Sequence, residues 1–381
     1  IRFRRIISKG NFIPEIDGLR FIAIASVVLF HLNVFLLEKD TSSYNVKFDF
    51  DIINKILSVG HLGVPLFFAI SGFILARPFA QMHINKGSKI NIKNYFIRRV
   101  TRLEPPYILI MTILLLGAVY VAKTVSLSDG ILSYFSSITY THNFFYGKGT
   151  LPLLNAVAWS LEIEIQFYIL MPLLAKIFMI RKDNKRRTVT IIFTLLFLIL
   201  DFVESMPFIS IINYLHYFLI GFLLADIYVC SNNSIKTIKY PAVVSVLSFI
   251  IVWFIELIEP SSAMASLTFS IIQIIAMFVF YYLVIIHRSI RLLANPLITN
   301  IGGMCYTIYL LHYPIISMFG NPLMKLNFSD NSLVNTLAYS SILLFVVMIF
   351  SALFFLLIER PCMDKNWYKR ILKRSPTKAI R

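Results

Sequence analysis

The sequence is poor in charged residues. Only 14% of its 381 residues are Asp, Glu, Lys or Arg, whereas soluble domains carry roughly 25%. Its longest polar stretches, about 38–60, 80–104, 123–152 and the residues after 359, are too short to bury cores of their own. We therefore expect residues 1–381 to form a single integral membrane domain with no appended soluble domain.

Cysteine is scarce as well. The three cysteines, Cys230, Cys305 and Cys362, lie in or near apolar segments, and an odd number there argues against a disulfide framework. No group of His, Cys, Asp and Glu has the spacing of a zinc or iron site, so the sequence predicts no metal. A clear internal repeat is also missing, which weakens the case for an inverted-repeat transporter.

Hydrophobic residues, by contrast, make up 58% of the chain. Apolar runs long enough to cross a bilayer as helices recur with short gaps. The predicted spans, with ends uncertain by several residues, are 19–37, 61–79, 105–122, 153–179, 189–204, 209–229, 241–258, 265–286, 298–319 and 335–358. The expected fold class is all-α, a polytopic membrane helix bundle with about ten transmembrane helices.

The net charge of +17 raises the question of a nucleic-acid partner. Alternate loops and both termini hold 30 of the 36 Lys and Arg residues, and the loops of the other side hold 6. This asymmetry is the positive-inside pattern, so we expect both termini to be cytoplasmic. The charge then reports topology, and no nucleic-acid partner is expected.

One apolar run, EIDGLRFIAIASVVLFHL, contains both Arg20 and His31. Eleven helical steps bring the second side chain back to within roughly 20° of the first and about 16 Å along the axis. A guanidinium at the cytoplasmic mouth can hold phosphates, and a deeper imidazole can accept a proton near neutral pH. The alternative is a topology-setting arginine with a histidine hydrogen-bonded inside the bundle.

Two other predicted spans contain small or acidic residues. In FFAISG, Ser71 and Gly72 allow close approach of a neighbouring helix or of a ligand, and simple packing is the alternative. In AWSLEIEIQFYILMP, Glu162 and Glu164 lie inside an apolar run, where a carboxylate is costly and marks a functional site by default. Glu164 could orient a histidine as triad carboxylates do, or pair with a buried cation.

Segment 90–104 is expected to form an amphipathic cytoplasmic helix that ends at a break at Pro105–Pro106. Its Arg99 and Arg102 lie one turn apart, and paired guanidinium groups suit phosphate. Ordinary positive-inside signalling explains these arginines equally well.

The stretch YTIYLLHYP contains another intramembrane histidine, His312, with Tyr306 and Tyr309 near its face. Catalysis and a hydrogen-bonded packing role both remain open for it. Three further histidines near span ends are interpreted as structural: His61, His142 and His216.

Six stretches in order resemble the acyltransferase family 3 of membrane proteins, which O-acetylates bacterial surface glycans and some antibiotics. They are IDGLRFIAI with His31 beyond it, FFAISG, RRVTRLEPPY, AWSLEIEIQFYILMP, YTIYLLHYP and IERP, and together they extend from residue 16 to residue 361. Two positions depart from the family pattern, because Ile165 replaces a second acidic residue and Cys305 replaces a serine. Both departures could alter the acceptor pocket.

The resemblance implies acyl-CoA as donor, His31 as catalytic residue and Glu164 as its support. The implied donor-binding residues are Arg20, Arg99 and Arg102. Further candidate substrate-binding or site-lining residues are Asp17, Ser71, Gly72, Trp159, Tyr306, Tyr309 and His312.

The resulting functional hypothesis is a multi-pass O-acyltransferase of the bacterial inner membrane. It would move an acyl group, with acetyl favoured, from cytoplasmic acyl-CoA to a hydroxyl of an extracytoplasmic or lipid-linked glycan, with His31 as general base. Membrane lipid is an expected partner, and the sequence leaves a homo-oligomer open. Two rivals are a proton-coupled transporter or flippase, which also suits buried Glu and His, and a non-catalytic partner in a polysaccharide assembly complex.

Overall fold

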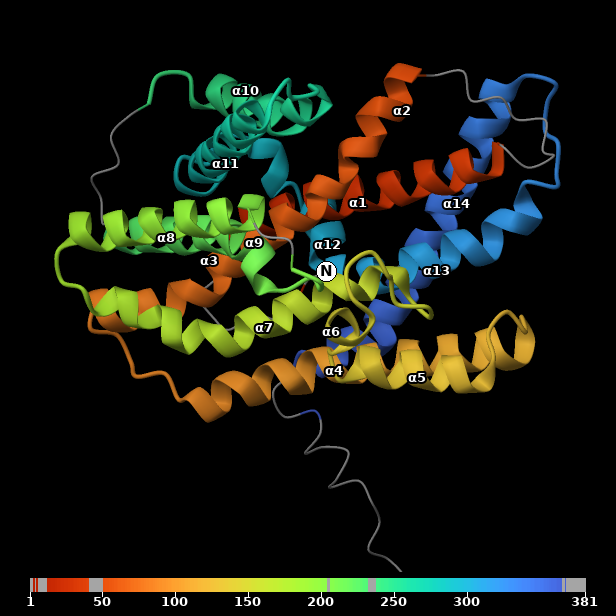
Figure 1. Ribbon diagram of the computed structural model, residues 1–381, viewed down its shortest axis with the longest axis horizontal. Helices are drawn as coiled ribbons and strands as arrows, with labels where there is room; N and C mark the ends of the chain where they lie inside the picture. Colours follow the sequence, from red (N-terminus) through yellow and green to blue (C-terminus); the bar gives the residue numbers. More distant parts are fainter. Residues whose placement is uncertain are drawn as a thin grey trace, which may run out of the picture.

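The computed structural model describes residues 3, 5, 12–40, 51–203, 206–231, 238–364 and 367. Every regular element within these ranges is a helix, which confirms the all-α expectation (Figure 1). Most of the predicted basic tail lies outside the described residues, so its placement stays a prediction.

The helices follow one another with short connections. In the first half of the chain they are α1 (Pro14–Asp40), α2 (Asp51–Ser58), α3 (Gly63–Ile84), α4 (Ile92–Leu116), α5 (Leu127–Ile138), α6 (His142–Tyr146) and α7 (Trp159–Leu174). In the second half they are α8 (Asp183–Val203), α9 (Ile211–Cys230), α10 (Pro241–Phe254), α11 (Ala263–Ile286), α12 (Pro296–Gly303), α13 (Cys305–Leu323), α14 (Ser332–Phe354) and α15 (Arg360–Cys362). Short 3-10 or π turns extend several of them.

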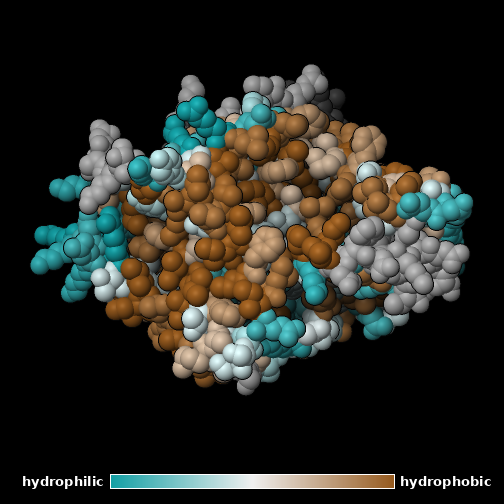
Figure 2. All heavy atoms as spheres, turned by 90° about the horizontal axis from the view of Figure 1, so that it is seen from above, coloured by the Kyte–Doolittle hydropathy of each residue, from teal (hydrophilic) through white to brown (hydrophobic). Residues whose placement is uncertain are grey.

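Six helical segments of the described chain are long and apolar enough to cross a membrane. They are Pro14–Glu38, Ile52–Ile84, Ile92–Val121, Ile211–Cys230, Ala263–Ile286 and Leu333–Cys362. Hydrophobic side chains cover the middle of the face seen in Figure 2, and hydrophilic ones gather at its left edge. Length and composition therefore support a membrane-embedded bundle.

The other four predicted spans coincide with helices that fall short of these properties. Helix α10 has 14 residues, and α7 has 16 with two glutamates. Charged residues lie towards both ends of α8, while Met304 separates α12 from α13. The expectation of ten spans is therefore supported for six, and the orientation of the termini stays a prediction.

Helices α3 and α9 pack backbone to backbone near the centre of the bundle. A Cβ added to Gly72 would lie 2.1 Å from the Phe218 carbonyl oxygen, and one added to Gly221 would lie 1.9 Å from the Ala69 oxygen. Small residues of this kind let membrane helices approach closely. Gly72 therefore allows the close approach of a neighbouring helix.

Helix α4 corrects the expected break at Pro105–Pro106, because it runs through both prolines without interruption. Pro105 has no N–H to donate to the carbonyl of Thr101, four residues earlier. The indole Nε1–H of Trp367 donates to that carbonyl instead, at 2.9 Å. Such substitute donors are what allow proline inside membrane helices.

Candidate functional site

His31 lines a cavity of about 160 Å³ beside α1. The other lining residues are Val27, Phe30, His61, Val64, Pro65, Val157, Trp159, Tyr214 and Tyr309. Because α1 is continuous from Pro14 to Asp40, Arg20 and His31 lie on one helix, as the spacing predicts. The imidazole faces an internal space, so it is positioned to meet a ligand.

A second histidine holds the His31 ring. Nδ1 of His31 lies 2.9 Å from the Val27 carbonyl oxygen and 3.1 Å from Nε2 of His312. Nδ1 of His312 lies 3.0 Å from the carbonyl oxygen of Ile308. Since a carbonyl only accepts, both Nδ1 atoms carry the proton, and both Nε2 atoms carry a lone pair. The lone pair of His312 accepts from His31, which leaves Nε2 of His31 unprotonated.

Tyr309 lies on the cavity wall, and its hydroxyl is already hydrogen-bonded to protein groups. That hydroxyl donates to the carbonyl oxygen of Val157 at 2.7 Å, so Ser160 Oγ, 2.6 Å away, donates to it in turn. Trp159 lies beside Ser160 at the start of α7, and its ring lies 5.6 Å from that of Tyr214. Aromatic rings therefore form much of the cavity wall.

Glu164 is bound by Ser71 and Tyr168. Ser71 Oγ donates to Glu164 Oε1 at 2.9 Å, and the Tyr168 hydroxyl donates to the same oxygen. The His31 ring is held by Val27 and His312 and not by Glu164. The supporting role of Glu164 in catalysis therefore stays a prediction. The carboxylate instead interacts electrostatically with Arg20 and Arg99.

Glu162, two residues earlier, has a local structural partner. Its Oε2 accepts from the backbone N–H of Asn143 at 2.9 Å, and Asn143 Nδ2 donates to the carbonyl of Trp159. This carboxylate therefore ties the α6 segment to the start of α7, beside the cavity.

The N-terminal end of α1 carries a cluster of buried ions. Asp17 Oδ1 binds Arg5 at 2.8 Å and Arg20 at 2.9 Å, and only 1% of the Asp17 side chain is exposed. Burial lowers the pKa of the Arg5 guanidinium to about 9, which leaves it charged at neutral pH. Asp17 thus positions two cations and compensates part of their charge.

Arg102 and Arg99 extend this cluster from α4. Arg102 interacts electrostatically with Arg5 and with Arg99, and its Nε is buried without a hydrogen-bond partner among the described residues. Arg99 stacks on the ring of Tyr95 at 3.6 Å and donates to the carbonyl of Tyr95 at 2.9 Å. The structure therefore gathers the three predicted arginines and adds Arg5.

Two residues of the YTIYLLHYP stretch hold helices together at this end. The hydroxyl of Tyr306 donates to the carbonyl of Leu103 at 2.9 Å. Thr307 donates through Oγ1 and, at 3.2 Å, through its N–H to the buried carboxylate of Glu359 in IERP. Tyr306 is thus anchored to α4, close to the arginine cluster.

The arginine cluster and the cavity are neighbouring but separate features. None of the arginines belongs to the described lining of the His31 cavity. Glu164 interacts electrostatically with members of both, namely Arg20 and Arg99 of the cluster and Tyr309 of the cavity lining.

Sequence reasoning missed two members of this region. His61, interpreted as structural, lines the cavity with His31, and its Nδ1 lies 2.9 Å from the Ser58 carbonyl. Arg5 precedes the first span and was counted only as part of the charge bias. The signal that could have found His61 is its place at the start of an apolar span, next to glycine residues.

No metal centre emerges from the geometry of the described residues: no group of three or more His, Cys, Asp or Glu side chains could hold an ion. All three cysteines are free.

Comparison with known families matches residues 13–357 to the model of the acyltransferase domain. The curated relatives include "Putative O-acetyltransferase SACOL0978" of Staphylococcus aureus (strain COL), which is 29% identical over 343 residues, covering 81% of this chain and 51% of the relative. "O-acetyltransferase OatA" of Staphylococcus aureus (strain NCTC 8325 / PS 47) is 25% identical over 334 residues, covering 80% and 51%. The chain thus spans about half the length of these relatives. No solved structure matches.

Proposed function

Because this chain belongs to the acyltransferase domain family, we propose that it transfers an acyl group from acyl-CoA to a glycan hydroxyl inside the membrane. The observation that carries the proposal is the place of His31 in the cavity wall, with Nδ1 held by Val27 and His312. The names of the relatives favour acetyl as the acyl group. They also favour group transfer over proton-coupled transport.

In the proposed reaction His31 acts as a general base. Nε2 of His31 takes the proton of the acceptor hydroxyl, whose oxygen attacks the thioester carbonyl carbon. The carbon–sulfur bond breaks, and the CoA thiolate takes the proton back from the imidazolium. The products are an O-acyl ester and free CoA. General-base assistance contributes about 10²- to 10⁴-fold to such a rate.

Donor binding is proposed at the arginine cluster. The buried Nε atoms of Arg5 and Arg102 lack partners among the described residues, and burying such donors is costly unless a ligand or water satisfies them. Phosphate oxygens fit guanidinium donors, and Arg20 and Arg99 add positive charge to the same place. Acyl-CoA is a substrate of suitable chemistry, since its phosphates can lie here while its arm extends towards His31.

Acceptor binding is proposed in the cavity. Aromatic side chains of Phe30, Trp159 and Tyr214 form its wall, and rings of this kind pack against the apolar faces of sugars. His61 adds a hydrogen-bonding group beside His31. A glycan or a lipid-linked sugar therefore suits the cavity better than a fully apolar acceptor.

The test is mass spectrometry of surface glycans from cells with and without the protein. We expect an acyl increment that requires the protein and disappears in the His31→Ala variant. His287→Ala is the matched control, because His287 caps α11 and does not belong to the described cavity lining. Normal glycan acylation in the His31→Ala cells would contradict the assignment of the base.

A further inference from the structure

A second cavity, of about 430 Å³, opens at the end of the bundle where α3 leads into α4. Its lining consists of His83, Ile84, Lys86, Phe178, Met179, Ile180, Arg181 and Arg186. Four of these residues are basic, four are apolar and none is acidic. The cavity shares no lining residue with the His31 cavity.

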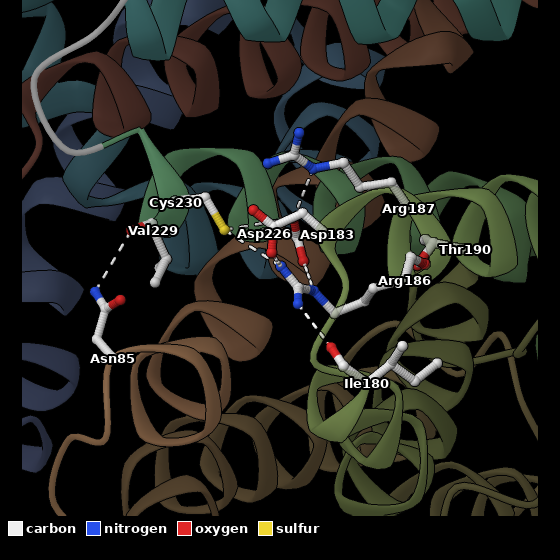
Figure 3. Close-up of polar contacts among 9 residues, drawn as sticks. All are labelled: Asn85, Ile180, Asp183, Arg186, Arg187, Thr190, Asp226, Val229 and Cys230. Carbon is white, nitrogen blue, oxygen red and sulfur yellow. Dashed lines mark hydrogen bonds and ion pairs between the residues drawn. The ribbon is translucent and has the colours of Figure 1, made fainter.

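A buried ion cluster builds one wall of this cavity (Figure 3). Arg186, only 2% exposed, donates through Nε to Asp226, through Nη2 to Asp183 at 2.9 Å and through Nη1 to the carbonyl of Ile180 at 2.8 Å. Arg187 donates to the other oxygen of Asp226 at 2.9 Å. Two guanidinium groups therefore face two carboxylates, so this cluster fixes the wall and adds little net charge.

The opposite wall is fixed by the end of α3. Asn85 Nδ2 donates to the carbonyl of Val229 at 3.4 Å, which ties this end to α9 (Figure 3). Asp226 lies one turn earlier on α9 and holds α8. The three helices are therefore locked together around the cavity, and its shape is set before any ligand arrives.

The other three basic side chains of the cavity have no partner among the described residues. The side chains of His83, Lys86 and Arg181 form no hydrogen bond or ion pair with another described residue. Lys86 and Arg181 are exposed and come from different segments that face the same space. This arrangement leaves a positive potential that a bound anion would neutralise.

Lys86 has an unfavourable backbone conformation. Its φ of 53° lies in the left-handed region, where a residue with a Cβ is strained and glycine is not. The turn is closed by the N–H groups of Asn85 and Gly87, which both donate to the carbonyl of Gln81. Glycine would form this turn at lower energy, so a Lys86→Gly change removes the side chain without straining the backbone.

The apolar half of the lining lies next to these charges. Met179 is 62% exposed, and Ile180 beside it is partly exposed. A soluble phosphate would leave this apolar surface in water, whereas a lipid would cover it. Basic pockets between transmembrane helices on the cytoplasmic side are known sites for anionic lipid headgroups.

We propose that this cavity binds the phosphodiester headgroup of an anionic phospholipid. Lys86 and Arg181 hold the phosphate oxygens, and an acyl chain lies against Ile84, Phe178 and Met179. The site does not depend on the proposed acyl transfer. Its test is accordingly a binding measurement.

Native mass spectrometry of the purified full chain, titrated with phosphatidylglycerol, measures the lipid bound. Removing the two charges with Lys86→Gln and Arg181→Gln should weaken binding about tenfold or more. The control pair, Lys123→Gln with Lys148→Gln, removes the same charge from exposed residues elsewhere, and Lys123 also has a positive φ, of 52°. Equal weakening in both pairs, or equal binding of phosphatidylethanolamine, would overturn the proposal.

The Lys86→Gly variant separates the effect of this side chain on lipid binding from its effect on stability. Glycine relieves the backbone strain, so this variant should have a higher melting temperature without lipid and yet bind phosphatidylglycerol more weakly. Unchanged lipid binding in a stable Lys86→Gly protein would refute the role of this side chain. Displacement of the lipid by inorganic phosphate or CoA at the lipid's own concentration would reassign the cavity to a soluble phosphate ligand.

Discussion

Nε2 of His312 lies 3.1 Å from Nδ1 of His31, although 281 residues separate the two histidines in the sequence. The contact joins α13 to α1 at the wall of the cavity. His312 is completely buried, and its own Nδ1 is held by Ile308. If His31 is the base that we propose, His312 takes the place of the carboxylate in a catalytic triad, because it accepts from the base and fixes its tautomer.

We expect His312→Leu to lower kcat by about 10- to 100-fold. Losing the hydrogen-bond partner that orients a metal-binding histidine has an effect of this size. The KM for acetyl-CoA should not change, because His312 does not belong to the arginine cluster. His312→Gln keeps an acceptor oxygen and should recover part of the rate. Steady-state kinetics on purified protein gives both constants. A positioning role is wrong if the Gln and Leu variants are equally impaired.

Arg102→Ala should raise the KM for acetyl-CoA by about 10- to 100-fold, since a hydrogen bond to a charged group contributes about 1.5–3 kcal/mol. The kcat should change much less. Arg98→Ala is the matched control, because Arg98 lies on the same helix and is exposed. If KM rises equally in both variants, the effect comes from the loss of surface charge in general, and Arg102 is not a specific donor-binding residue.

Tyr309→Phe distinguishes a structural hydroxyl from a catalytic one. This hydroxyl already donates to Val157, so it has no proton left for a developing oxyanion. The variant should lose about 1–3 kcal/mol of stability, because a buried carbonyl becomes unpaired, and should keep most of its kcat. Thermal unfolding and initial rates measure the two effects. A loss of about 10²- to 10³-fold in kcat would instead mark Tyr309 as the oxyanion donor.

Periodicity along one helix was the reliable part of the sequence reasoning. The common face of Arg20 and His31 follows from helix geometry, and α1 is continuous between them. The partner of His31 could not be found in this way, because His312 meets it only through the packing of α13 on α1. A carboxylate is the usual partner of a catalytic histidine, which made Glu164 the expected partner of His31. In the structure Ser71 and Tyr168 donate to Glu164 instead.

The same limit explains the errors in the helix boundaries. Two adjacent prolines predict a break, but α4 continues because Trp367, far along the chain, supplies the missing donor. His61 was interpreted as a structural histidine at a span end, and only the approach of α1 to the 3-10 turn Val59–Leu62 brings it to the cavity. Local patterns therefore identified most of the candidate groups, and tertiary contacts decided their partners.

The contact between α3 and α9 predicts how packing controls the site. Gly221→Ala places a Cβ 1.9 Å from the Ala69 oxygen and 2.5 Å from the Phe73 nitrogen, so the two backbones must separate. Overpacking of this kind costs about 1–3 kcal/mol or more. Since α3 carries Ser71 and α9 carries Tyr214, the separation should lower both the melting temperature and the acyl-transfer rate.

Gly117→Ala is the control for this prediction. Nothing lies within 4 Å of a Cβ added at Gly117, and its φ of −63° is helical. Alanine should therefore stabilise that helix by about 0.5–1 kcal/mol and leave the rate unchanged. Thermal unfolding in detergent and label transfer from acetyl-CoA test both variants. If Gly221→Ala melts at the wild-type temperature, the helices are not packed as closely as the structure describes.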